Sequence, residues 1–182
     1  MNAIAYFENH GFVSFSSTAK KSCLITFRLH SFQPFSTHAI HIHEYGDLRQ
    51  GCSSLGGHYN PHNQTHGNIL SNERHVGDLI NNFTLDKNGN FEFEYIDPSI
   101  SINDIIGRSV VIHENLDDLG LKSLYNIPYI SLDDCTLRLL CKQRGYTNLK
   151  TRKERIDKLE RESLITGNAG LRLACAIIGK CR

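Results

Sequence analysis

HIHEYGDLRQGCSSLGGHYNPHNQTHGNILSNERHVGD, residues 41–78, joins the end of an apolar, β-branched run to a long segment that is interrupted by glycine and proline. Neutral imidazole is the commonest protein ligand for zinc and copper, and a carboxylate adds charge compensation. Six potential ligands fall within this stretch: His41, His43, His58, His66, His75 and Asp78. Such a concentration is hard to explain by packing or solubility, so the stretch predicts a metal site.

The spacing of these residues separates two structural roles. His41 and His43 are two residues apart at the end of the run Ala39–His43, so they point to the same face of a predicted strand. The later ligands lie in a segment punctuated by Gly56-Gly57 and Pro61, which favours a loop. A rigid strand and a loop that folds back over it are together suited to enclose a metal.

The remaining histidines have a simpler interpretation, because an isolated histidine is usually a surface or hydrogen-bonded side chain. We interpret His10, His30, His38 and His62 in this way. His62 lies between two candidate ligands, and the spacing alone does not exclude it.

Composition is typical of one globular domain. The chain has 182 residues, a formal net charge of +1 and 9% aromatic residues. A chain of this length buries roughly two thirds of its unfolded surface in a single core. The small net charge argues against a nucleic-acid or membrane partner. No apolar run approaches about 18 residues, and residues 1–8 lack a basic flank, so we expect neither a membrane span nor a signal peptide.

Short β-rich runs recur along the chain and are separated by turn signals. The predicted strands are Ile4–Phe7, Phe12–Phe15, Leu24–Leu29, Ala39–His43, Asn82–Leu85, Phe91–Tyr95, Ser109–His113 and Leu173–Ile178. Asn88-Gly89 predicts a hairpin between Phe83 and Phe91, because both residues tolerate positive φ. About eight strands without βαβ alternation indicate an antiparallel sandwich or flattened barrel.

Several longer motifs accompany the histidine-rich stretch. They are His41–Asp47, Gly51-Cys52, Gly57–Pro61, His66-Gly67, Glu73–Leu79, Ile106–Arg108, His113-Glu114, Asp117–Gly120 and Thr166–Cys175. In this order they resemble the copper,zinc superoxide dismutase family, from about Ala3 to Gly179. The resemblance extends to the versions encoded by giant DNA viruses of amoebae. The resemblance implies an all-β fold, a Greek-key β-sandwich or flattened barrel of about eight antiparallel strands, with long metal-binding and electrostatic loops.

The resemblance also implies a set of site residues. It gives copper the ligands His41, His43, His58 and His113, and it gives zinc the ligands His58, His66, His75 and Asp78. His58 then bridges both metals, and Asp117 links His41 to His66 from behind the ligands. A carboxylate in that position fixes the imidazole rings and raises their basicity.

The implied activity is dismutation of superoxide to dioxygen and hydrogen peroxide by cycling copper, with zinc as a structural metal. His58 is the implied proton donor, and Arg172 supplies the cation that guides the anion. A disulfide between Cys52 and Cys175 is also implied. In the chain-entropy model such a closure is worth on the order of 4 kcal/mol. Cys23 is expected to be a small buried hydrophobe.

The chain departs from the family pattern at about 121–165, where an insertion replaces a shorter loop. We therefore predict one superoxide dismutase domain over residues 1–182 with this addition. Lys150–Glu162 favours helix by propensity, but Ile156 and Leu159 form only a narrow apolar stripe. A solvated or disordered surface helix is expected there, in preference to a docking element.

Association and location are further implications of the resemblance. A homodimer is expected through the positions Ile4, Gly46, Ile106, Gly107 and Ile177. The expected location is the cytoplasm, which is the host cytoplasm or the virion for a viral protein. A copper chaperone is an expected partner, and the alternative function is an inactive, metal-binding decoy of such chaperones. A protein that binds only zinc is a second alternative.

Overall fold

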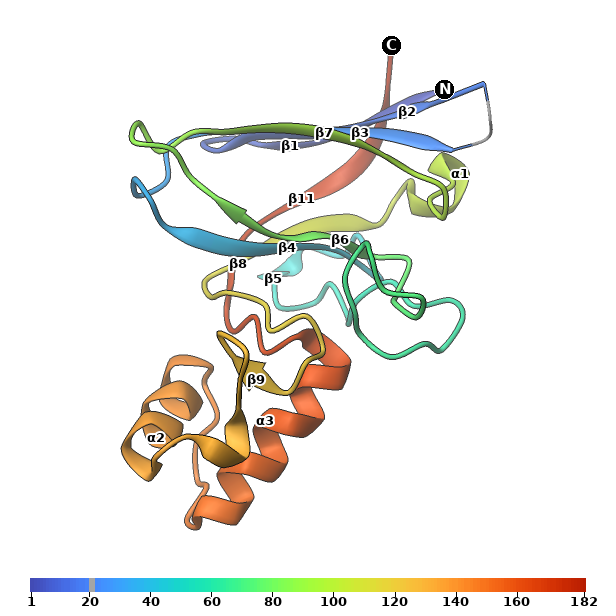
Figure 1. Ribbon diagram of the computed structural model, residues 1–182. Coiled ribbons are helices and arrows are strands. Elements are labelled where there is room, and N and C mark those ends of the chain that lie inside the picture. The colour runs from blue at the N-terminus through green and yellow to red at the C-terminus, as the bar shows by residue number, and fades with distance from the viewer. Residues whose placement is uncertain (20–21) are drawn as a thin grey trace.

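The computed structural model describes residues 1–19 and 22–182 (Figure 1). None of the helices in this part of the chain combines the length and apolar content that a membrane crossing needs. The strands are β1 (Asn2–Phe7), β2 (Gly11–Ser17), β3 (Cys23–Leu29), β4 (Thr37–His43), β5 (Arg49–Cys52), β6 (Asp78–Thr84), β7 (Phe91–Asp97), β8 (Ser109–His113), β9 (Ser123–Leu124), β10 (Ile127–Pro128) and β11 (Arg172–Cys181). The helices are α1 (Ile102–Ile105), η1 (Tyr129–Ser131), α2 (Asp134–Gln143) and α3 (Arg152–Thr166).

Eight of the strands form one antiparallel sheet in the order β6-β4-β8-β11-β1-β2-β3-β7. The sheet curls into a nearly closed barrel, with β1, β2, β3 and β7 in one layer and β4, β6 and β8 in the other (Figure 1). β11 joins the layers by pairing with β1 and β8. The predicted all-β fold and the eight predicted strands are confirmed. β5, β9 and β10 were not predicted, because short strands carry little periodic signal.

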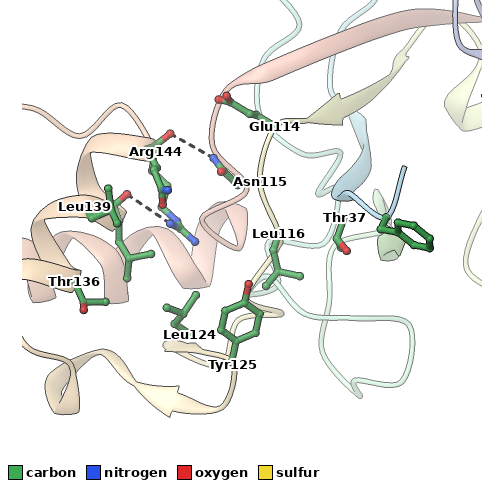
Figure 2. A pocket seen from close by; sticks show the side chains of 12 residues that line it. Thr37, Glu114, Asn115, Leu116, Leu124, Tyr125, Thr136, Leu139 and Arg144 are labelled. Carbon is green, nitrogen blue, oxygen red and sulfur yellow. Dashed lines mark hydrogen bonds between the residues drawn. The ribbon is translucent and has the colours of Figure 1, made fainter. Parts of the chain in front are cut away.

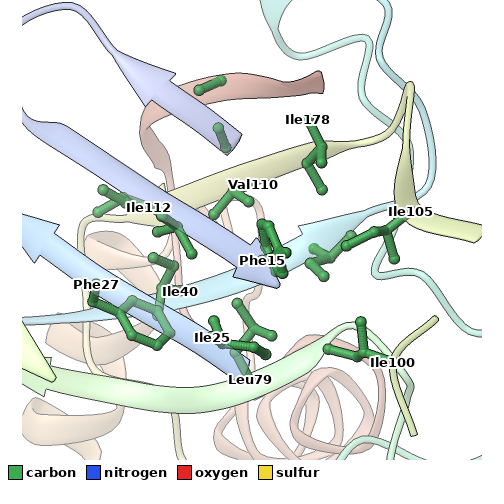
Figure 3. Packing of buried hydrophobic residues seen from close by; sticks show 14 of the residues in the cluster. Phe15, Ile25, Phe27, Ile40, Leu79, Ile100, Ile105, Val110, Ile112 and Ile178 are labelled. Carbon is green, nitrogen blue, oxygen red and sulfur yellow. The ribbon is translucent and has the colours of Figure 1, made fainter. Parts of the chain in front are cut away.

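Alternation along the strands builds the barrel core. Every second residue of β3, including Ile25 and Phe27, is buried, and Ile40 of β4 and Ile112 of β8 face them from the other layer (Figure 3). Each such side chain contributes about 1.5–3 kcal/mol on full burial. Cys23 lies in the same row, so its expected role as a small buried hydrophobe is confirmed. Burial raises the pKa of its thiol to about 11.

The opposite faces of β4 and β8 point out of the barrel. Ile40 pairs with Ile112 and lies in the core, so the period of two turns His41, His43 and His113 outward. These outward side chains are nevertheless buried, because the long connections after β4 and β8 fold over them. A polar layer therefore lies outside the apolar core, and it contains the histidines.

The turn at Asp86–Asn90 forms as predicted, but the predicted hairpin is wrong. Gly89 has φ +75° and its N–H donates to the Asp86 carbonyl. β6 and β7, which the turn connects, pair with β4 and β3 rather than with each other. The two strands diverge into different layers, where each finds an inner neighbour. The turn therefore links the two edges of the barrel.

The segment 121–165 has a small apolar core of its own, made by Tyr129, Leu132, Leu137, Leu140, Cys141 and Leu159. α2 and α3 lie together below the barrel in Figure 1. α3 starts with a capping box between Thr151 and Glu154 and ends at Gly167, whose φ is +61°. The expected solvated or disordered helix is wrong, because the narrow stripe around Leu159 is covered by η1 and α2.

A buried polar cluster connects this small core to the barrel. The Asp118 carboxylate accepts hydrogen bonds from Tyr129 Oη at 2.5 Å, Ser163 Oγ at 2.8 Å and Asn168 Nδ2 at 2.7 Å. Tyr129 belongs to η1 and Ser163 to α3, whereas Asp118 follows β8 by only a few residues. The 121–165 segment is thus attached to the barrel immediately beside Asp117.

Leu159→Ala tests whether α3 is docked. Leu159 has no exposed surface, so we expect the free energy of unfolding of the 121–165 segment to fall by about 2–5 kcal/mol. Hydrogen exchange of the α2 and α3 amides measures this loss. Leu139→Ala is the matched control, because Leu139 is 54% exposed on α2 and its truncation should change little. Equal exchange rates in the two variants would contradict the docked helix.

Candidate metal centre

The outward histidines of β4 and β8 meet a histidine of the covering loop. His41, His43, His58 and His113 place one ring nitrogen each within 4.8 Å of one another, and all four are buried. We call these residues the four-histidine group. The strands supply three of its members, and His58 reaches it through a bridge between the backbones of His43 and His58.

In His41, His43 and His113, one ring nitrogen donates a hydrogen bond to a residue outside the group. These hydrogen bonds indicate which nitrogen of each ring remains available to a metal. His43 Nδ1 donates to the Gly56 carbonyl at 3.1 Å, His113 Nδ1 to the Gly170 carbonyl at 3.3 Å and His41 Nε2 to Asp117 at 2.6 Å. The opposite nitrogens keep their lone pairs and converge. His43 Nε2 and His113 Nε2 lie 3.2 Å apart.

Two more nitrogens of the group point into the same space. His41 Nδ1 and His58 Nε2 are buried and have no hydrogen-bond partner. Buried polar atoms without a partner are rare in proteins, and a metal ion supplies the missing interaction. Four converging imidazole nitrogens are a donor set that suits copper. The residues present therefore fit a metal.

A second group lies directly beside the first and contains His58, His66, His75 and Asp78. Asp78 Oδ1 lies 3.0 Å from His58 Nδ1, 3.0 Å from His66 Nδ1 and 3.2 Å from His75 Nδ1. Donors arranged as a tetrahedron around zinc are about 3.3 Å apart, given metal–ligand bonds of 2.0–2.1 Å. We call these residues the Asp78 group. Three nitrogens and one carboxylate oxygen at this spacing fit zinc.

His58 belongs to both groups. Its Nδ1 faces Asp78, and its Nε2 faces the four-histidine group, where its ring stacks on His41 with centroids 4.0 Å apart. One imidazole therefore separates the two donor sets. The ring has two nitrogens that can act as ligands, and His58 offers one of them to each donor set.

Asp117 supports both groups from behind. Its carboxylate accepts from His41 Nε2 at 2.6 Å and from His66 Nε2 at 2.9 Å, and it is 1% exposed. Burial raises the pKa of this carboxyl, but the hydrogen bonds from His41 and His66 outweigh that effect and hold the pKa well below its usual range. A fixed negative charge therefore orients one ring of each group.

The family profile described as "Copper/zinc superoxide dismutase (SODC)" matches residues 9–131 of the chain. Together with the paired donor sets, this match decides the family. The chain belongs to the copper/zinc superoxide dismutase family. Copper and zinc are its metals, and superoxide dismutation is its activity.

Individual relatives agree with this family. The chain is 36% identical over 171 residues to "Superoxide dismutase [Cu-Zn]" of Paramecium bursaria Chlorella virus 1, over 92% of this chain and 70% of the relative. It is 40% identical over 147 residues to "Superoxide dismutase [Cu-Zn] A" of Xenopus laevis, over 79% of this chain and 72% of the relative.

Two further similarities extend this comparison. The chain is 34% identical to "Copper chaperone for superoxide dismutase" of Homo sapiens over 93% of its own length, but it covers only 48% of that protein. A solved structure titled "Crystal Structure Analysis of the clock protein EA4" superposes with a TM-score of 0.71 at 30% identity, covering 98% of this chain and 93% of that one.

The disulfide of this superoxide dismutase joins Cys52 of β5 to Cys175 of β11, as expected from the family resemblance. It anchors the loop beside Arg172, the first residue of β11. The Arg172 guanidinium is half-buried and donates to the carbonyls of Cys52 and Gly56. Gly56 also accepts from His43 Nδ1, so one carbonyl holds both the arginine and a histidine of the four-histidine group.

Burial sets the charge state of most of these imidazoles. It lowers the pKa of His58 to about 3, with a further contribution from His41, and it lowers the pKa values of His43 and His113 well below the usual range. Neutral imidazole is the form that binds metals. His66 differs, because its hydrogen bonds to Asp117 and Asp78 overcome burial and raise its pKa to about 10.

The other histidines lie outside both groups. His38 is buried and its Nδ1 donates to the His113 carbonyl at 3.0 Å, so it supports the strand that carries His113. His10, His30 and His62 join neither group, and the structure thereby resolves the doubt about His62. The interpretation of these histidines as ordinary hydrogen-bonded or surface side chains is consistent with this arrangement.

Three residues around Asp117 were missed from the sequence. Asn81 Nδ2 donates to the Asp117 carboxylate at 3.1 Å, and the Asn82 side chain exchanges two hydrogen bonds with the Asp117 backbone. Gly167 lies so close that a Cβ atom there would be 2.0 Å from Asp117 Oδ1 and 2.5 Å from His66 Nε2. Two consecutive asparagines, Asn81 just before the predicted strand and Asn82 at its start, were the available signal.

Gly167→Ala tests the support that Asp117 gives to the Asp78 group. The added methyl displaces the carboxylate from His66, so we expect zinc affinity to fall by about 10–100-fold. Competition against a chromophoric chelator measures it. Gly145→Ala is the matched control, because Gly145 also has positive φ but its Cβ would meet only Leu171 at 3.7 Å. Equal zinc affinities in both variants would refute this role.

Proposed function

We propose that the four-histidine group holds copper and that the Asp78 group holds zinc, in an enzyme that dismutates superoxide. The observation that carries the assignment is the division of His58 between the two groups. Copper favours the set of four nitrogens, and a tetrahedral set of three nitrogens and one carboxylate is typical of zinc. Asp117 acts as the shared support of His41 and His66.

The residues around the two proposed metals then have separate roles. When bound, copper supplies the one-electron redox chemistry, and zinc, which has none, supplies a fixed positive charge. His58 Nε2 is the atom at which a proton is held and passed to the reduced product. Asp78 keeps the other nitrogen of His58 in place, and the β4 and β8 histidines stay fixed through their hydrogen bonds to Gly56, Gly170 and Asp117.

Arg172 is proposed to attract and position superoxide. Its guanidinium stays charged at all relevant pH values and is held by two backbone carbonyls rather than by a carboxylate. Its positive charge is therefore not neutralised by an ion pair within residues 1–19 and 22–182. A fixed cation beside the four-histidine group raises the local concentration of a small anion.

His113→Ala separates the two metal sites. His113 belongs only to the four-histidine group, so we expect the variant to lose copper and activity while it retains zinc. Metal analysis combined with a superoxide dismutation assay measures both effects. His62→Ala is the control, since His62 belongs to neither group, and it should retain both metals. Loss of zinc together with copper in His113→Ala would contradict the assignment.

Arg172→Gln tests the guiding role of the guanidinium. We expect kcat/KM to fall by about 10- to 100-fold, because the attraction for the anion is lost. Added salt should slow the unmodified enzyme and affect the variant less, since salt screens charge attraction. Arg28→Gln, on the distant strand β3, is the control and should behave like the unmodified enzyme. Activity that rose with salt would count against attractive steering.

The alternative of an inactive decoy is less well supported, because all the expected copper ligands and Arg172 are present and lie together. The similarity to the copper chaperone keeps a chaperone among the proposed partners, but the chain covers less than half of that protein. A zinc-only protein is excluded if stoichiometric copper is found in the protein purified with its metals.

Domain organisation, assembly and location complete the proposal. We treat residues 1–182 as one domain with an addition at about 121–165, supported by the buried bonds of Asp118. A homodimer is supported by the positions Gly46, Ile106 and Gly107, which lie together and line one shallow hollow. Sedimentation at dilute concentration tests it. The cytoplasm of a host cell, or a virion, and an antioxidant role are supported by the similarity to the chlorella virus enzyme.

A further inference from the structure

Arg144 is a buried guanidinium without a counterion, and it lies far along the chain from the metal ligands. It follows α2 and is only 6% exposed. Its Nε is buried without any hydrogen-bond partner, and its Nη1 reaches only the Leu140 carbonyl, at 3.5 Å. Within residues 1–19 and 22–182, no carboxylate oxygen lies within 4.0 Å of it. Burial of an unpaired charge is costly, so this arrangement requires a reason.

Neither of the nearby acidic side chains, Asp118 and Glu114, forms an ion pair with Arg144 in the described part of the chain. The Asp118 carboxylate already accepts hydrogen bonds from Tyr129, Ser163 and Asn168. Glu114 is exposed, and Figure 2 shows its carboxylate on the far side of Asn115 from the guanidinium. The Arg144 side chain instead points toward Leu124 and Tyr125, across an open space (Figure 2).

That space is a cavity of about 510 Å³ between α2 and the strand end that carries Glu114 and Asn115. Leu116, Leu124, Leu139 and Leu140 supply its apolar walls, and Arg144 supplies its buried charge. Pockets for small molecules are typically about 300–1,000 Å³, with mostly apolar walls and a few placed polar groups. The cavity therefore has the size of a small-molecule site.

We propose that this cavity binds a small organic carboxylate, whose head pairs with Arg144 and whose apolar body lies against Leu116, Leu124 and Leu139. A guanidinium matches a carboxylate with two parallel hydrogen bonds. A single charge is favoured over a phosphate dianion, because Arg144 is the one cationic side chain that lines the cavity among the described residues, and Glu114 lines it as well.

The site bears on the metal centre through the chain that forms its wall. Glu114, Asn115 and Leu116 connect His113, a member of the four-histidine group, to Asp117. A ligand held between this connection and α2 fixes the 121–165 segment against the barrel. Binding therefore stabilises the folded protein by an amount that grows with the logarithm of the ligand concentration above its dissociation constant.

Three probes separate the parts of the ligand: octanoate has the head and the body, acetate has only the head, and octan-1-ol has only the body. Each is titrated into the metal-loaded protein and followed by amide chemical shifts and by calorimetry. We expect saturable octanoate binding at least about tenfold tighter than that of the other two probes, with shifts at Asn115, Leu116 and Gln143. Octan-1-ol that binds as tightly as octanoate, or octanoate that fails to saturate, would overturn the proposal.

Arg144→Met removes the charge and keeps an apolar stem, so we expect octanoate affinity to fall by about tenfold or more. Arg138→Met is the matched control, because Arg138 is an exposed α2 arginine that is paired with Asp134, and it should bind normally. Leu139→Glu is a second variant at an exposed position, which provides a test that does not depend on the folding of Arg144→Met. Its carboxylate repels the head and competes for Arg144, so octanoate binding should weaken. Unchanged octanoate affinity in Leu139→Glu, or in a folded Arg144→Met, would refute the site.

Discussion

The buried carboxylate of Asp117 is the interaction on which the arrangement of the metal centre depends. It holds the ring of His41, which comes from a barrel strand, and the ring of His66, which comes from the covering loop. A buried negative charge is stable only when donors surround it, and here Asn81 and the Leu119 amide complete the set. The strand and the loop are therefore fixed relative to each other before any metal is considered.

The same region connects the metal centre to the unusual part of the chain. Asp118, the next residue, receives hydrogen bonds from Tyr129 and Ser163 of the 121–165 segment, and Gly167 packs against Asp117 itself. The 121–165 segment is thus part of the structure that surrounds the metal centre. Its small apolar core packs beside the polar layer that positions the ligands. Disorder in α3 is therefore expected to displace the Asp117 carboxylate, which supports the ligands.

Much of the fold followed from local patterns. Alternation of apolar residues located the eight strands of the barrel, because burial on one face of a strand imposes a period of two. The docking of α3 could not be foreseen in this way. Leu159 offers a narrow stripe, and its partners Tyr129 and Leu137 belong to other elements of the segment. The prediction of a hairpin at Asn88-Gly89 was wrong for a related reason. The turn residues specify the turn itself, but they do not specify which strands pair on either side of it.

The sequence by itself determined the ligand types, their order and the shared strand face of His41 and His43, because these properties depend on residue chemistry and on the pleat of one strand. The position of His58 between two donor sets was expected from the family resemblance. Only the tertiary structure decided which ring nitrogen of each histidine is free and that Asn81, Asn82 and Gly167 enclose Asp117. The burial of Arg144 beside a cavity is likewise a property of the tertiary structure. These features depend on contacts between segments far apart in the chain, and spacing along one segment carries no information about them.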